Sequence, residues 1–344
     1  MINYEMKYRA FQVHNFRNIP QIKALSDEEI RDIEITGNVF PFKVNNYVID
    51  ELIDWDNYSS DPIFRLTFPQ KEMLEEKDFA TMKKALDENV DRKELKLIAD
   101  SIREKLNPHP AGQMELNVPE YKGEKLHGVQ HKYKQTLLFF PSSGQTCHSY
   151  CTFCFRWAQF VGMDGLKFAA RETEQLMGYL SEHHEVTDIL FTGGDPMIMS
   201  FKVFKQYIEP FLEPDNKTNI QTIRLGTKVL GFWPYKFITD KDAQEFLDLF
   251  KRIVDSGINL SIMAHFNHEN ELKTAAVKEA VKLIRKTGAQ IRTQSPLIKN
   301  INDDADMWAR MWRKQVNMGM IPYYMFVERD TGARHYFEVP LEKT

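Results

Sequence analysis

The second part of the chain alternates short apolar runs with amphipathic helical segments, and this alternation limits the fold more than any other feature. The apolar runs lie at 136–140, 186–191, 222–225, 258–264, 289–293 and 321–326, and the helical segments lie at 171–183, 201–212, 240–256, 271–287 and 303–318. Strands that alternate with helices form a parallel sheet through right-handed βαβ units. Six strands suit an open barrel better than a closed one of eight, so we expect an α/β fold, a partial (β/α)6 barrel.

The first part of the chain has a different pattern. Residues 1–125 are expected to form an N-terminal mainly helical region, and the barrel is expected to cover 126–344. Helical segments are predicted at 25–35, 72–86 and 92–106, and Ser26 before the acidic Glu28 and Glu29 is a plausible helix N-cap. The polar stretch 111–130 is expected to be irregular.

Composition narrows the class of protein. The formal net charge of −4 counts against non-specific nucleic-acid binding, which needs a basic surface. No apolar run approaches the roughly 18 residues that cross a bilayer. The first residues lack the apolar core of a signal peptide. We therefore expect a cytoplasmic protein without membrane or nucleic-acid partners.

The chain contains only three cysteines, Cys147, Cys151 and Cys154, and they lie within eight residues of one another. Their odd number and close spacing do not suit a disulfide framework. They follow the first predicted barrel strand, where (β/α) folds place their chemistry. Thiolates are the preferred ligands of iron–sulfur clusters. Three ligands leave one iron of a [4Fe–4S] cluster open, and S-adenosylmethionine (AdoMet) can occupy it.

Two other interpretations of the cysteines stay open. The three positions also match one face of a helix, where buried cysteines simply pack. A zinc site would need a fourth ligand, for which His148 is close enough in sequence. Ser142, Ser143 and Gly144 favour a loop at this point, and the cluster is the interpretation that we favour.

Several segments together resemble the radical SAM superfamily, and within it the lysine 2,3-aminomutase family. The cysteine motif has the form C-x3-C-x-aromatic-C, with Phe153 as the aromatic residue. After successive predicted strands come the segments FTGGDP (191–196), IRLGTK (223–228), HFNHENE (265–271) and TQSPL (293–297), and PYY (322–324) opens the last strand. The resemblance covers roughly residues 125–340 and implies a radical SAM barrel, a [4Fe–4S] cluster and AdoMet.

The resemblance implies roles for particular residues at the cofactor site. Phe153 shields the cluster and packs near the adenine of AdoMet, and the segment with Gly193, Gly194 and Asp195 contacts its amino group. A tight turn with an N-cap at Asp195 is the alternative for that segment. The AdoMet site is further lined by Arg224, His265, His268 and Gln294, and for each histidine a structural role is the alternative.

The resemblance also implies how the substrate is held. Arg156, two residues after the third cysteine, corresponds to the arginine that binds the substrate carboxylate, a task that suits a bidentate guanidinium. A surface or cluster-tuning arginine is the alternative. Asp330, after the last predicted strand, is nearest to the aspartate that holds a substrate ammonium. After the position of Arg156 the family has further arginine, whereas this sequence has Trp157, Ala158 and Gln159. This difference weakens the case for the family's phosphate site.

The family's cofactor pyridoxal phosphate (PLP) requires a lysine in a glycine-rich segment after the last strand. The printed sequence has no such segment before Thr344, and Lys343 lies too early. We therefore expect PLP-independent hydrogen abstraction from a small amino-acid-like substrate, and the sequence leaves the use of PLP open. The alternatives are a PLP-dependent lysine-type 2,3-aminomutase and a non-catalytic iron–sulfur electron-transfer or sensor protein. By analogy we expect a reductant such as flavodoxin or ferredoxin, and a homodimer.

Overall fold

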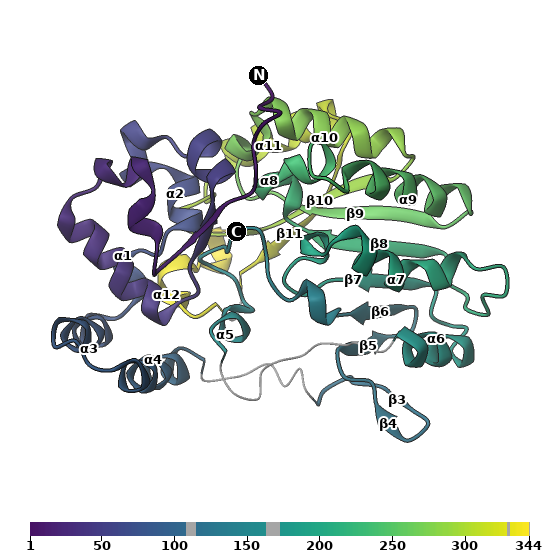
Figure 1. Ribbon diagram of the computed structural model, residues 1–344, viewed down its shortest axis with the longest axis horizontal. Coiled ribbons are helices and arrows are strands. Elements are labelled where there is room, and N and C mark those ends of the chain that lie inside the picture. The colour runs from purple at the N-terminus through teal and green to yellow at the C-terminus, as the bar shows by residue number, and fades with distance from the viewer. Residues whose placement is uncertain (108–114, 163–172, 329–330, 344) are drawn as a thin grey trace.

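The computed structural model of the chain describes residues 1–107, 115–162, 173–328 and 331–343. A curled sheet with helices along its outer side makes up the teal to yellow part of Figure 1, and a mainly helical N-terminal part in purple lies beside it. The C-terminal helix α12 (Arg334–Phe337) lies beside the N-terminal part, where His335 Nε2 is 2.9 Å from Glu72 O.

The main sheet contains β5 (Val129–Tyr133), β6 (Thr136–Phe139), β7 (Asp188–Phe191), β8 (Thr222–Thr227), β9 (Asn259–His265), β10 (Gln290–Leu297) and β11 (Ile321–Val327). These strands are neighbours in sequence order. All pairs from β6 to β11 are parallel, and β5 pairs antiparallel with β6. The parallel strands are the expected apolar runs, so the predicted partial α/β barrel is confirmed. Because they run in one direction, their carboxyl ends share one rim.

The helices that connect the parallel strands are α6 (Thr173–Glu182), α7 (Phe201–Leu212), α9 (Ala243–Asp255), α10 (Ala275–Lys286) and α11 (Ala305–Asn317). They agree with the expected helices, although residues 171 and 172 of the first lie outside the described residues. The shorter helices α5 (Trp157–Phe160) and α8 (Val229–Phe232) lie in the connections, and α12 (Arg334–Phe337) follows the last strand. No helix among the described residues combines the length and the apolar character needed to cross a membrane.

Helix α10 illustrates how the local sequence sets these boundaries. The Thr274 side chain accepts a hydrogen bond from Val277 N and caps the first turn. Ala276, Val277, Ala280, Val281 and Ile284 are buried, at the spacing of one helix face. Gly288 follows the helix with a φ of +90°, which lets the chain turn into β10.

The N-terminal part contains the helices α1 (Asp27–Val39), α2 (Pro62–Thr67), α3 (Glu76–Asp87) and α4 (Arg92–Leu106), and the antiparallel strands β1 (Ala10–Gln12) and β2 (Lys43–Asn45). The predicted cap of α1 is confirmed as a capping box. Glu29 N donates to Ser26 Oγ at 3.2 Å, and Ser26 N donates to Glu29 Oε2 at 2.8 Å.

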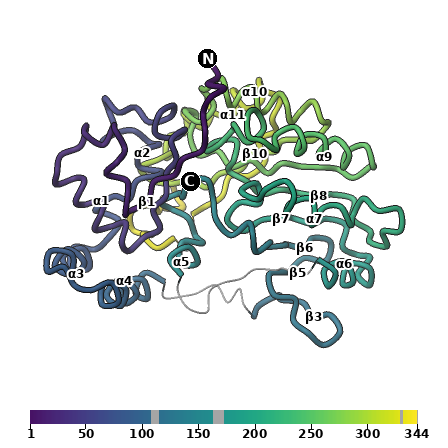
Figure 2. The backbone as a smooth tube through the Cα atoms, in the orientation of Figure 1, coloured from purple at the N-terminus to yellow at the C-terminus, as the bar shows by residue number. Residues whose placement is uncertain are grey.

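The N-terminal part packs against the barrel in one continuous hydrophobic core. The ring of Phe40 lies 5.4 Å from that of Trp157 in the barrel. In Figure 2 the first residues run as a purple tube from the N-terminus down to β1. Along this path Tyr8 Oη donates to His148 O at 2.7 Å. Contacts of this kind place the N-terminal part beside the carboxyl-end rim of the sheet.

The expectation of an irregular stretch over 111–130 is wrong in its second half, and residues 111–114 lie outside the described residues. Strands β3 (Glu120–Tyr121) and β4 (Glu124–Lys125) form a hairpin, and β5 begins at Val129. The hairpin turn is made by Lys122 and Gly123, whose φ angles are 52° and 82°. Two successive positive φ angles are typical of a two-residue hairpin turn. Lysine is unusual at the first of these two positions, where Asn, Asp or Gly is common.

Candidate functional site

The cysteine loop, residues 141–156, leaves the carboxyl end of β6. It begins with the 3-10 turn Ser142–Gly144, and from 145 to 156 it forms turns and bends without a helix. The three cysteines are half-buried. The interpretation that they lie on one helix face is therefore wrong, and the prediction of a loop on the functional rim is confirmed.

The backbone of the N-terminal part binds the cysteine loop directly. Tyr150 N donates to Lys43 O of β2 at 2.8 Å, and Thr152 N donates to Leu66 O of α2 at 2.9 Å. These two bonds act on residues next to Cys151 on either side. The middle of the cysteine motif is thus held by chain segments that precede it by about 100 residues, as the separation of 86 between Thr152 and Leu66 illustrates.

Asn45, at the end of β2, joins the cysteine loop to the barrel. Its backbone N donates to Ser149 Oγ at 3.0 Å. Its buried side-chain Nδ2 donates to His148 O at 3.3 Å and to Phe232 O of α8 at 2.8 Å. A buried amide that satisfies carbonyls of two different loops fixes their separation.

Each cysteine has a cation in its surroundings. Burial raises the pKa of all three thiols, and the neighbouring cations oppose this effect. The opposing cations are Lys43 at Cys147, Lys228 at Cys151 and Arg156 at Cys154. A metal that binds a thiolate displaces its proton, and nearby cations favour the thiolate. Three thiols with this electrostatic support fit the donor set of an iron–sulfur cluster.

Phe153 of the cysteine loop lies beside His265. Their ring centroids are 5.9 Å apart, and Phe153 is buried. His265 is the last residue of β9, and its neighbour across the sheet is Gln294 of β10. His265 Nε2 is buried without a hydrogen-bond partner among the described residues. An unpaired buried nitrogen is costly, so its position beside the cysteine motif fits a polar ligand group there.

Gly193 and Gly194 lie against the cysteine loop. Gly193 has a φ of +141°, which favours glycine. A Cβ at Gly194 would lie 2.5 Å from both N and O of Thr146. The glycine pair is thus needed for the close approach of two backbone segments, a reason that the sequence did not reveal. Contact with AdoMet stays a prediction for both.

Asp195 is buried and connects the loops after β7 and β8. Its carboxylate accepts hydrogen bonds from Thr227 Oγ1 at 2.6 Å, Met197 N at 2.9 Å and Lys228 N at 2.9 Å. Burial raises the pKa of Asp195 to about 6. The bond from Met197 N gives Asp195 the N-cap position that was the alternative interpretation. Its contact with AdoMet stays a prediction.

Arg156 is a buried cation at the end of the cysteine loop, with 4% of its surface exposed. Its Nη2 donates to Gln145 Oε1 at 2.9 Å and to Gln159 Oε1, and its guanidinium lies 4.7 Å from the Phe140 ring centroid. Among the described residues, Nε has no hydrogen-bond partner and no carboxylate pairs with the guanidinium. Burial lowers the pKa of Arg156 to about 10. This arrangement excludes the surface-arginine alternative and leaves capacity for an anion.

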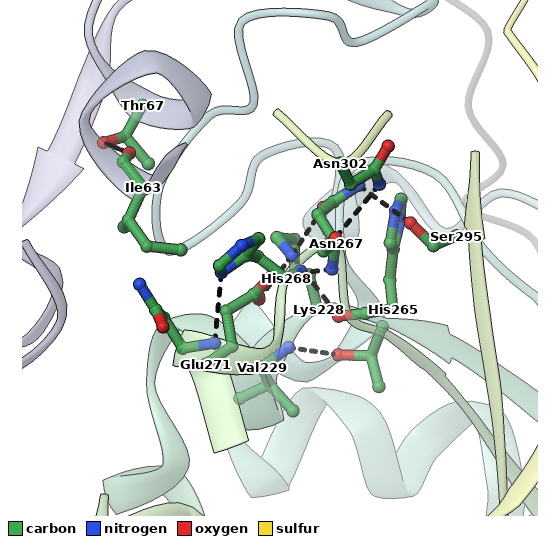
Figure 3. Close-up of polar contacts among 12 residues, drawn as sticks. Ile63, Thr67, Lys228, Val229, His265, Asn267, His268, Glu271, Ser295 and Asn302 are labelled. Carbon is green, nitrogen blue, oxygen red and sulfur yellow. Dashed lines mark hydrogen bonds and ion pairs between the residues drawn. The ribbon is translucent and has the colours of Figure 1, made fainter. Parts of the chain in front are cut away.

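A buried polar network, drawn in Figure 3, joins the loops that follow β8, β9 and β10. Lys228 Nζ donates to Glu271 Oε2 at 2.7 Å and to Asn267 Oδ1 at 2.9 Å. Glu271, which is 0% exposed, accepts at Oε1 from Asn267 N at 2.7 Å and His268 N at 3.0 Å. Asn302 Nδ2 donates to Asn267 O at 3.0 Å. The sequence interpretation missed this network, although the segments that follow two predicted strands contain its charged residues, Lys228 and Glu271.

His268 caps the 3-10 turn Glu269–Leu272. Its Nδ1 accepts a hydrogen bond from Asn270 N at 3.2 Å (Figure 3). Burial lowers the pKa of His268 to about 4, so the ring is neutral near pH 7. The structural alternative for His268 therefore has direct support, and its role at AdoMet stays a prediction.

Two predicted site residues are not joined to the others. Arg224 Nε donates to Asp188 Oδ1 at 2.8 Å. Asp188 is the first residue of β7, so this contact points toward the amino end of the sheet, away from the cysteine loop. Asp330 lies outside the described residues. The roles proposed for both stay predictions.

Among the described residues, no group of three His, Cys, Asp or Glu side chains is arranged to hold a single metal ion. A cluster differs from such a site because each thiolate binds its own iron. His148, the candidate fourth zinc ligand, is buried, and burial lowers its pKa. Its ring packs edge-on against Tyr8 at 5.7 Å, and its Nδ1 has no hydrogen-bond partner among the described residues.

Comparison with known proteins gives consistent names. No protein-family model matches the chain. It is 30% identical to a putative L-lysine 2,3-aminomutase of Aquifex aeolicus over 323 residues, which cover 94% of the chain and 74% of that protein. The L-lysine 2,3-aminomutase of Methanococcus maripaludis is 23% identical over 90% of the chain and 60% of its own length. That of Haemophilus influenzae is 25% identical over 65% of the chain and 62% of its own length. The chain spans about three fifths of the last two proteins.

Proposed function

Because the chain belongs to the L-lysine 2,3-aminomutase family of radical SAM enzymes, we propose that it cleaves AdoMet reductively and uses the resulting radical on a small amino-acid-like substrate. The observation that carries this proposal is the cysteine loop at the carboxyl end of β6, with a cation at each thiol. When bound to Cys147, Cys151 and Cys154, a [4Fe–4S] cluster supplies the electron that converts AdoMet to methionine and a 5′-deoxyadenosyl radical.

The residues around the loop prepare this chemistry. Phe153 excludes water from the cysteine motif, since its buried ring packs at 5.9 Å from His265 and 6.3 Å from Phe337. His265 offers Nε2 to a polar group of AdoMet, because this buried atom has no partner among the described residues. A dry pocket strengthens every polar contact within it and protects a radical from solvent.

Arg156 is proposed to bind the substrate carboxylate. Its amide partners, Gln145 and Gln159, orient the guanidinium without neutralising its charge. A carboxylate accepts bidentate hydrogen bonds from such a group more strongly than from a neutral donor. Asp330 is proposed to hold the substrate ammonium, in keeping with the family resemblance.

We further propose that the reaction does not need PLP. Where the family resemblance implies a further arginine, Trp157 is buried against Phe40 and Gln159 binds Arg156, so neither provides a cation for a phosphate group. A PLP-dependent 2,3-aminomutase is the second candidate, and the names of the relatives favour it.

The test is anaerobic incubation of the reconstituted protein with AdoMet and dithionite, with and without candidate amino acids. We expect 5′-deoxyadenosine from the wild type, none above background from Cys151→Ser, and an unchanged amount from Ser143→Ala, an exposed position in the same loop. A loaded cluster without 5′-deoxyadenosine would favour an electron-transfer or sensor protein. Formation of a β-amino acid only after addition of PLP would favour the second candidate.

A further inference from the structure

Lys43 is a lysine of the N-terminal part that contacts the backbone of a predicted cluster ligand. Its Nζ donates to Cys147 O at 2.7 Å and to Thr146 Oγ1 at 3.3 Å. The same ammonium lies 5.6 Å from the centroid of the Tyr150 ring. Three groups of the cysteine loop thus surround one side-chain cation.

The position of Lys43 is fixed by the strand that carries it. It is the first residue of β2 and lies opposite Gln12 of the antiparallel strand β1. Its own carbonyl accepts from Tyr150 N at 2.8 Å, so the backbone and the side chain of one residue bind the same loop. The next residue, Val44, is buried in the core. Groups carried by packed strands keep their geometry better than groups on free loops.

Lys43 also differs from Lys228 in its charge balance. Lys228 forms a buried ion pair with Glu271 at 2.7 Å, which offsets its charge. Within the described ranges of the chain, no carboxylate forms an ion pair with Lys43. Lys43 is half-buried, so solvent screens its charge less than that of a surface lysine.

We infer that Lys43 raises the reduction potential of the cluster, so that the N-terminal part takes part in the redox chemistry of the site; this inference rests on the proposed function. One electron from an external one-electron reductant converts [4Fe–4S]2+ to [4Fe–4S]1+ and adds one negative charge to the site. A fixed ammonium nearby stabilises that added charge, and charges and hydrogen bonds around the sulfurs are what set such potentials. The alternative is that Lys43 only anchors the loop.

The test is a potentiometric titration of the reconstituted protein under anaerobic conditions. The EPR signal of the reduced cluster is measured at each potential. Lys43→Gln keeps a donor for Cys147 O but removes the charge. At a fixed solution potential we expect it to lower the ratio of reduced to oxidised cluster by about tenfold, which is ~59 mV for one electron. Lys43→Arg keeps the charge and should stay close to the wild type. Lys93→Gln, at an exposed position of α4, is the matched control.

Several outcomes overturn the inference. It fails if Lys43→Gln binds a full cluster whose reduction potential equals that of the wild type. It also fails if the reduction potential of Lys43→Arg is lowered as much as that of Lys43→Gln, since only the geometry of the side chain would then matter. If the glutamine variant does not retain a cluster, the inference also fails, because Lys43 then acts as an anchor of the cysteine loop. A wild type that binds no cluster removes the proposed function together with this inference. If the wild type forms 5′-deoxyadenosine but Lys43→Gln leaves the reduction potential unchanged, only the inference about Lys43 fails.

Discussion

The cysteine loop and the loops after β8, β9 and β10 lie on the same rim but are held in different ways. The cysteine loop obtains its partners from the N-terminal part, chiefly through backbone hydrogen bonds and the Asn45 amide. The other loops are held by side chains of the barrel itself, centred on Lys228 and Glu271. The first arrangement allows residues far away in sequence to influence the cysteines. The second holds the loops of the barrel in place through a buried ion pair.

The largest effect on the barrel loops is expected from Lys228→Met. This change leaves Glu271 buried without its cation, and loss of one partner of a buried pair costs roughly 3–5 kcal/mol. Urea unfolding of the wild type and of Lys228→Met measures the difference in the free energy of unfolding. Lys251→Met is the matched control, because its pair with Asp255 is exposed and contributes about 0.2–1 kcal/mol. Equal losses of unfolding free energy in Lys228→Met and Lys251→Met would contradict the prediction that the buried ion pair of Lys228 stabilises these loops.

A smaller effect on stability, with a specific effect on the cysteine loop, is expected from Asn45→Ala. The change removes hydrogen bonds to His148 O and Phe232 O, and unpaired buried groups cost about 1–3 kcal/mol. We also expect less iron bound per protein after reconstitution, measured together with the unfolding free energy. Ser26→Ala, which removes the cap of α1 at a cost of ~1 kcal/mol, is the control for stability alone. If both variants bind iron equally well, the contacts of Asn45 do not control the loop.

The smallest effect is a pH dependence that belongs to the barrel loops. Burial lowers the pKa of His268 to about 4, whereas an unfolded histidine has a pKa of about 6.5. Between these values the unfolded chain binds a proton that the folded protein does not, so stability falls as the pH falls through this window. The slope contributed by one such group is at most ~1.4 kcal/mol per pH unit.

His268→Asn keeps a hydrogen-bond acceptor for Asn270 N and removes the titrating ring. Unfolding free energies at pH 6.5 and 5 should therefore differ less in this variant than in the wild type. Glu269 does not interfere, because its pKa is lowered to about 2 by its cationic partners despite burial, and its contribution is lost only at lower pH. His14→Asn, the same substitution at an exposed position, is the matched control.

Much of the fold was predictable because its signals are local. The periodicity of 201–212 and 92–106 matches α7 and α4 at both ends. The six parallel strands follow from apolar runs of strand length, and the loop character of the cysteine motif follows from Ser142 to Gly144. The hairpin at β3 and β4 was missed because its turn places Lys122 at a positive φ, which lysine rarely adopts.

The sequence by itself determined the alternation of strands and helices, the position of the three cysteines after the first parallel strand, and the family resemblance. Only the tertiary structure decided what surrounds those cysteines. Lys228 and Glu271 are separated by 43 residues, and Lys43 and Cys147 by 104. Such pairs meet because parallel strands bring their carboxyl ends to one rim and because the N-terminal part packs against it. No local pattern of apolar or charged residues encodes these distances, since they depend on the packing of the whole core.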